Sequence, residues 1–355
     1  MHVPDGFIDI PVSLAAGAVA AGAVAVALRG AREELAGPPG SGTSGERLAP
    51  LAGLVAAFVF AAQMLNFPVG AGTSGHLMGG ALAAILVGPW TGILCLSVVL
   101  LLQGVLFADG GLTALGVNIT VMGVVTALSG YAVFRVLVKI LPRGRRAVTG
   151  SAFAAALVSV PLAALAFTLV YAVGGTTDVP LGKVATAMVG VHVLIGMGEA
   201  VITALTVGAV LAVRPDLVYG ARDLARPLKL RVGGEPVEAP QPRTAPRTSH
   251  RKVWLGGLAA SLVLAGFVSF YASAEPDGLE KVAADRGIDA KAREHDTAGW
   301  PLADYGVGDL TDARISGGLA GIIGVGVTVA AGTGVFLAVR RRRGPDAPRD
   351  QGKAG

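Results

Sequence analysis

The sequence predicts an all-α fold of the polytopic membrane type. Of its 355 residues, 53% are hydrophobic and only 15% are charged, whereas about a quarter of the residues in a soluble globular domain carry a charge. The mean hydropathy is +0.64, and the apolar residues gather in long runs. Because a membrane helix needs about 20 mostly apolar residues, we expect a bundle of seven spans followed by two further spans.

The expected spans are bounded by residues that do not continue an apolar helix. The first ends at Arg29 and Arg32, and a Gly/Pro/Ser-rich connector precedes the second. Glycines around His76 interrupt the pattern before the third span, which is short and ends at Gly88. A proline-rich hydrophilic linker follows the seventh span, and an acidic segment separates the eighth from the ninth. The nine spans cover about residues 10–28, 51–67, 77–87, 91–107, 112–140, 148–173, 184–213, 253–274 and 315–339.

The basic residues predict how the chain is oriented. They cluster at Arg29 and Arg32, at residues 143–146, in the linker 214–252 and at residues 340–343. Segments beside membrane spans that are rich in Lys and Arg stay in the cytoplasm. The N-terminus, the loop around His76 and the acidic segment 275–314 should therefore lie outside, and the C-terminus inside.

The first residues carry the main candidate metal site. A secretory signal would place Lys or Arg before its apolar run, whereas this chain has His2 and no basic residue before Arg29. The Met1 amine, the His2 amide nitrogen and the His2 imidazole can form adjacent chelate rings around one ion. Nitrogen ligation in a plane suits Ni(II) or Cu(II), and imidazole also suits cobalt. The alternative is that a histidine at position 2 is incidental.

His76 is the expected fourth nitrogen ligand. It follows a glycine-rich break at a membrane span, where non-helical backbone is tolerated if it lines a cavity or is buried in protein. The orientation argument places it on the same face as His2. The alternative is a polar residue satisfied within a helix cap. Binding should weaken at low pH, because the amine and both imidazoles must lose protons to ligate.

Three polar residues within the spans are candidates for supporting roles. His192 and Glu199 are seven residues apart, which places them on one helix face, and ionisable residues inside a span usually face the bundle interior. We expect a pathway or ligand-orienting role, or a hydrogen-bonded pair that fixes helix packing. Asn118 could orient a ligand histidine, although such residues also serve as contacts between helices.

Several classes of function are disfavoured. The net charge of +5 belongs to residues beside membrane spans and does not indicate nucleic-acid binding. The chain has no G-x-x-x-x-G-K-[ST] phosphate loop, no H-E-x-x-H and no G-x-S-x-G, so nothing argues for an enzyme. Cys95 is the single cysteine, which excludes an intrachain disulfide.

The chain contains five stretches that read as motifs: MHVPDGF at 1–7, GTSGHL at 72–77, GPW at 88–90, DGGLTALG at 109–116 and the segment 192–200. They resemble motifs of the CbiM/NikM family, the cobalt/nickel substrate-binding components of energy-coupling-factor ABC transporters. The resemblance covers about residues 1–220 and is specific at both histidine motifs. A later stretch, Pro276-Asp277-Gly278-Leu279-Glu280, resembles the PDGLE domain of the small NikN-type accessory component.

The resemblance implies an organisation and a role. Residues 1–220 would form the metal-binding membrane domain, 221–252 a cytoplasmic linker, 253–343 the PDGLE domain and 344–355 a polar tail. Met1, His2 and His76 would bind Ni(II) or Co(II) as transported substrate, with no bound catalytic cofactor. A separate coupling membrane subunit and separate ATPase subunits would supply energy, consistent with the missing phosphate loop.

Two other functions stay open from the sequence. A membrane sensor or scaffold would use the outer loop for protein contacts, and it would tolerate His2→Ala. An intramembrane enzyme would use His192 and Glu199, but no catalytic motif accompanies them. The choice between nickel and cobalt is also open, because nitrogen ligands accept both, and the PDGLE fusion favours nickel.

Overall fold

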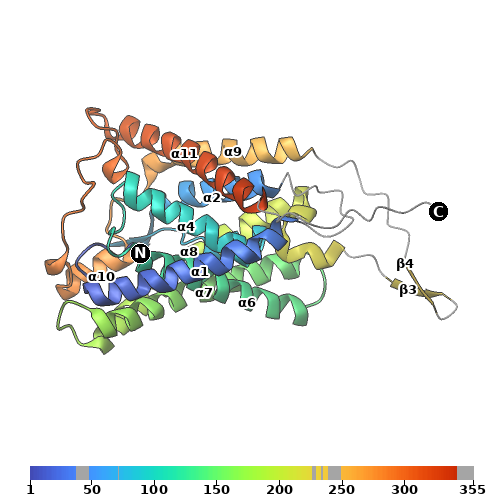
Figure 1. Ribbon diagram of the computed structural model, residues 1–355, viewed down its shortest axis with the longest axis horizontal. Helices are drawn as coiled ribbons and strands as arrows, with labels where there is room; N and C mark the ends of the chain where they lie inside the picture. The colour runs from blue at the N-terminus through green and yellow to red at the C-terminus, as the bar shows by residue number, and fades with distance from the viewer. Residues whose placement is uncertain (37–47, 71, 226–228, 233–234, 239–248, 342–355) are drawn as a thin grey trace, which may run out of the picture.

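The computed structural model describes residues 1–36, 48–70, 72–225, 229–232, 235–238 and 249–341. The expected Gly/Pro/Ser-rich connector, part of the linker and the polar tail 344–355 lie outside these residues. The described helices run along the long axis of the molecule, and Met1 lies at the same end as α10 (Figure 1).

The expected all-α membrane fold is confirmed. Seven described helices are long and apolar enough to cross a bilayer, and each of the nine predicted spans contains a helix. The long helices are α1 (Ile10–Ala36), α4 (Pro89–Leu106), α7 (Arg145–Gly174), α8 (Leu181–Val213) and α11 (Ala313–Arg341). The fifth span consists of α5 (Leu115–Asn118), a π-helical segment η2 (Ile119–Val125) and α6 (Thr126–Ile140).

The third expected span is broken rather than helical throughout. After α2 (Leu48–Gln63), the chain forms an antiparallel hairpin from β1 (Phe67–Gly70) and β2 (Thr73–Gly75). An extended stretch then leads to α3 (Gly80–Val87), which at 1.5 Å per residue is only about 12 Å long. The third span therefore consists of an extended stretch and a short helix.

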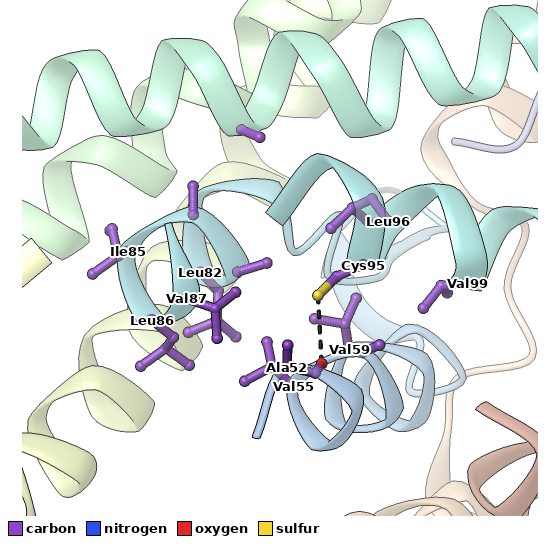
Figure 2. Close-up of a cluster of buried hydrophobic side chains, with 14 of the residues drawn as sticks. Ala52, Val55, Val59, Leu82, Ile85, Leu86, Val87, Cys95, Leu96 and Val99 are labelled. Carbon is purple, nitrogen blue, oxygen red and sulfur yellow. Dashed lines mark hydrogen bonds between the residues drawn. The ribbon is translucent and has the colours of Figure 1, made fainter. Parts of the chain in front are cut away.

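The short helix α3 is stable because protein surrounds it on every side. All its residues are buried. Figure 2 shows α3 beside α2 and α4, with Leu82 and Val87 on the side toward α2 and Ile85 on the far side, and Cys95 of α4 donates its thiol to the carbonyl oxygen of Ala52 at 3.5 Å. Irregular backbone at membrane depth is tolerated in such a place, because no polar group meets lipid.

The last two spans pack on the first seven. They are α9 (His250–Gly266), extended by η5 (Val268–Tyr271), and α11, and both contact α2. Between them lie α10 (Gly278–Arg286) and the short helices η6 (Asp289–Lys291) and η7 (Ala303–Tyr305). Elements η3 (Pro215–Leu217), η4 (Tyr219–Ala225) and the hairpin of β3 (Lys229–Val232) and β4 (Glu235–Glu238) follow α8.

We expect Gly321→Leu to weaken the contact between α9 and α11. A Cβ atom at Gly321 would lie 2.5 Å from the carbonyl oxygen of Ala265, a backbone atom that cannot move aside. Overpacking of this kind typically costs about 1–3 kcal/mol, which thermal unfolding in detergent would record as a lower midpoint. Gly326→Leu is the matched control on the same helix, because its Cβ would meet nothing within 4 Å. Equal midpoints for the two variants would contradict the prediction.

Candidate metal centre

Backbone contacts hold the N-terminal segment against the first bundle. The side chain of Asn118 accepts a hydrogen bond from the Val3 N–H at 2.8 Å and donates to the Val3 carbonyl at 3.1 Å. The same carbonyl accepts a bond from the Gly111 N–H at 2.9 Å. Asn118 therefore positions the segment that carries Met1 and His2, rather than a histidine ring as the sequence suggested.

Asp5 supplies a second anchor, which the sequence analysis missed. Its carboxylate accepts hydrogen bonds from the backbone N–H groups of Leu112 at 3.1 Å and Thr113 at 2.8 Å, and from the Thr113 hydroxyl. A Cβ atom at Gly111 would lie 2.3 Å from the Asp5 nitrogen. The Asp-Gly pairs at 5–6 and 109–110 are the signal that could have indicated paired turns here.

The structure brings the Met1 amine to His76. Met1 is 3% exposed and His76 is 7% exposed, and the amine nitrogen lies 2.6 Å from His76 Nε2. Adjacent nitrogen corners of a planar site with bonds of about 2.0 Å would be about 2.8 Å apart. Burial lowers the pKa of the His76 ring, and the nearby positive amine lowers it further, so the ring is held in the neutral form that ligates metals.

The His2 ring completes the cluster. Its centroid is 5.1 Å from that of His76, with the planes inclined by 62°. Its Nδ1 pairs with the Asp109 carboxylate, and its Nε2 is buried with no hydrogen-bond partner among the described residues. Burial raises the pKa of Asp109, but the pairing with His2 and a bond from Tyr305 outweigh it and lower the pKa to about 2.

The two ionisable residues within α8 do different things. As the spacing predicted, both are fully buried on one helix face. Glu199 accepts hydrogen bonds from the backbone N–H groups of Met78 at 2.6 Å and Gly79 at 3.1 Å, so it holds the chain that directly follows His76. His192 Nδ1 lies 2.7 Å from the Met188 carbonyl, and its Nε2 has no partner among the described residues.

The loop 275–314 lies on this site. His295 in this loop is half-buried, and its Nε2 lies 3.2 Å from the Gly110 carbonyl. The Met1 amine donates to Asp277 Oδ2 at 2.7 Å. A cavity of about 590 Å³ adjoins these groups, and it is lined in part by His2, His76, Asp109, Asp277, Glu280 and Arg314.

Side chains alone do not form a metal cage in this place. Among the described residues, no three His, Cys, Asp or Glu side chains are grouped to hold an ion. A metal centre at this end of the bundle therefore depends on backbone nitrogens, and the Met1 amine and His2 amide are the nitrogens beside the two imidazoles.

A match between this sequence and a protein-family model identifies the family. The model described as the cobalt uptake substrate-specific transmembrane region, CbiM, matches residues 2–217, which is more than half of the chain. The chain belongs to the CbiM family. A second model, the PDGLE domain, matches residues 251–341 of this CbiM-family chain.

Relatives and solved structures agree with this assignment. A putative metal transport protein of Haloquadratum walsbyi is 40% identical, over 62% of this chain and 94% of that protein. The fused nickel transport protein NikMN of Rhodobacter capsulatus is 27% identical, over 96% and 98% of the two chains. The crystal structure of a truncated transition metal transporter is 27% identical, with a TM-score of 0.50, over 60% of this chain and 99% of that one. This CbiM-family chain is therefore a multi-pass membrane component of a transport system.

Proposed function

We propose that this chain captures Ni(II) or Co(II) as the substrate-binding component of an energy-coupling-factor ABC transporter. The observation that carries the proposal is the approach of the Met1 amine to 2.6 Å from His76 Nε2, with the His2 ring beside them. The amine, the His2 amide nitrogen and the two imidazoles supply four nitrogens, and ligation by four nitrogens in a plane suits Ni(II).

An ion that binds at this centre replaces protons on two nitrogens and the contact between His2 and Asp109. The ion displaces protons from the amine and the His2 amide, since a nitrogen needs a free electron pair to ligate. A chelate through His2 Nδ1 also releases that ring nitrogen from Asp109. Asn118 and Asp5 keep the backbone in place during the exchange, because their hydrogen bonds are made to atoms outside the ligand set.

The relative that spans nearly the whole chain favours nickel as the substrate. This Rhodobacter capsulatus protein is named a fused nickel transport protein, whereas a Geobacter sulfurreducens protein named a cobalt transport protein is 32% identical over 74% of this chain. Residues 1–220 would form the metal-binding domain, and 253–343 the PDGLE domain, joined by the cytoplasmic linker 221–252.

In the proposed topology the metal centre lies on the extracytoplasmic side of the membrane. Met1, His76, Asp109 and the segment 275–312 meet at one end of the bundle, and the C-terminal ends of α1 and α8, with Arg32 and Arg214 near them, lie at the other (Figure 1). By the positive-inside rule that second end faces the cytoplasm. There the chain would meet the separate coupling and ATPase subunits.

Substitution of His2 tests the transport function against the sensor or scaffold alternative. We expect His2→Ala to abolish Ni(II) uptake above background in cells that express the chain with its coupling and ATPase subunits, because the change removes a chelate ring. His250→Ala, a histidine change at the first residue of α9, should leave uptake at the wild-type level. Retention of uptake by His2→Ala at equal membrane abundance would support the scaffold alternative.

A further inference from the structure

A carboxylate from the C-terminal domain reaches the candidate metal centre. Asp277 directly precedes α10 and is 8% exposed. Its Oδ2 lies 2.7 Å from the Met1 amine nitrogen and 3.5 Å from His76 Nε2. The nearest groups to this oxygen are thus the two nitrogens that would share the ion, although 276 residues separate Asp277 from Met1.

The two carboxylate oxygens of Asp277 have different hydrogen-bond partners. Oδ1 accepts hydrogen bonds from the backbone N–H groups of Leu279 at 2.7 Å and Glu280 at 2.8 Å. Glu280 in turn accepts a bond from the Asp277 N–H at 2.8 Å, which completes a capping box at the start of α10. The cap therefore fixes the side chain and leaves Oδ2 directed at the amine.

The segment before α10 is attached to β2, the strand that directly precedes His76. The Ser74 N–H donates to the Pro276 carbonyl at 2.9 Å, and the Ser74 hydroxyl donates to the Glu275 carbonyl at 2.7 Å. On the other side, a Cβ atom at Gly278 would lie 2.7 Å from Ile195 Cδ1. Asp277 is thus held between β2 and α8, and its carboxylate keeps a constant position relative to His76.

We propose that Asp277 is part of the metal centre, where its Oδ2 accepts an N–H from the ligating Met1 amine and its charge offsets that of the bound ion. The inference rests on the proposed function. An amine, a deprotonated amide and two neutral imidazoles around a divalent ion leave one net positive charge. Burying an unpaired charge is costly, and outer partners of metal ligands typically affect affinity about 10- to 100-fold.

On this basis the PDGLE segment closes over the captured ion and retains it. The same segment also contacts the N-terminal backbone at a second point, where the Arg293 N–H donates to the Asp5 carbonyl at 2.9 Å. Removal of the Asp277 charge should therefore act mainly on release of the ion, since release requires the amine to leave both the metal and the carboxylate.

The test uses the purified full-length chain with the substitution Asp277→Asn. Asparagine is as good an N-cap as aspartate, so the change removes the charge and keeps the cap. We expect the Kd for Ni(II), measured by competition with a chromogenic chelator, to rise roughly 10- to 100-fold. Release of Ni(II) into excess chelator should accelerate by a similar factor.

Two further variants distinguish the effect of removing the Asp277 charge from an effect on folding. Asp285→Asn removes a carboxylate from the same helix, where Asp285 pairs with Lys281 at 2.6 Å, and it should bind Ni(II) as the wild type does. If Asp277→Asn does not fold, Asp277→Ser takes its place, because serine also caps helices and has a shorter side chain. We expect it to lose Ni(II) affinity by the same factor. Wild-type affinity and release rate in a folded Asp277 variant would overturn the inference and leave Asp277 as a helix cap only.

The same assay distinguishes failure of the inference from failure of the proposed function. A chain with one extra residue before Met1 is measured beside the Asp277 variants. If the extension removes Ni(II) binding and Asp277→Asn does not change it, only the role of Asp277 is wrong. If the extended chain binds Ni(II) as the wild type does, the N-terminal centre itself is wrong, and with it the inference.

Discussion

One extra residue in front of Met1 is expected to abolish stoichiometric binding of Ni(II) or Co(II) while the fold is retained. The extension leaves every side chain in place but moves the free amine by about 3.8 Å, the distance between consecutive Cα atoms. The nitrogen of Met1 becomes an amide. The amine would therefore leave its contacts with His76 and Asp277.

The measurement is metal content after gel filtration, followed by titration of the apo-protein. The loss of affinity should exceed the roughly 10- to 100-fold effect of an outer partner, because the extension removes a direct ligand. A residue appended after Gly355 is the matched control, since it lengthens the chain equally. Unchanged stoichiometry and affinity in the N-terminally extended chain would show that the metal binds elsewhere.

Removal of the Glu199 carboxylate is expected to destabilise the chain and to weaken metal binding together. Glu199→Ala leaves the buried N–H groups of Met78 and Gly79 without an acceptor. Each such group typically costs about 1–3 kcal/mol, so we expect the two to lower the free energy of unfolding by roughly 2–6 kcal/mol. His76 lies two residues before Met78, so its Nε2 would no longer be held at the amine.

Thermal unfolding in detergent, with and without Ni(II), measures both effects. Glu199→Gln should be intermediate, because its single carbonyl oxygen can accept from one of the two N–H groups at full strength. Thr186→Ala is a control on the same helix, since it removes only an exposed bond to the Gly182 carbonyl. A Glu199→Ala variant with wild-type unfolding and wild-type Ni(II) affinity would contradict this role.

Composition and residue order were sufficient to predict the membrane fold. Hydropathy is a property of each segment, so every predicted span could be recognised without its neighbours, and each contains a helix. The distribution of basic residues also placed Met1, His76 and the loop 275–314 on one face, and the structure brings them into contact at one end of the bundle. The spacing of His192 and Glu199 predicted their shared buried face.

The sequence by itself did not predict what each polar group contacts. It did not show that the third span is partly extended, because short helices and extended stretches have the same hydropathy when both are buried. It also missed the anchoring role of Asp5 and treated Asn118 as a possible partner of a histidine.

Only the tertiary structure showed that Asp277 lies beside Met1 and that Glu199 holds the chain after His76. Such pairings depend on how distant segments pack, and a carboxylate in a loop has the same local sequence whether it is solvated or buried against an amine. The sequence thus determined which nitrogens are candidates for the metal centre, because residue type limits ligand chemistry. The packing of β2, α8 and α10 decided which groups surround those nitrogens.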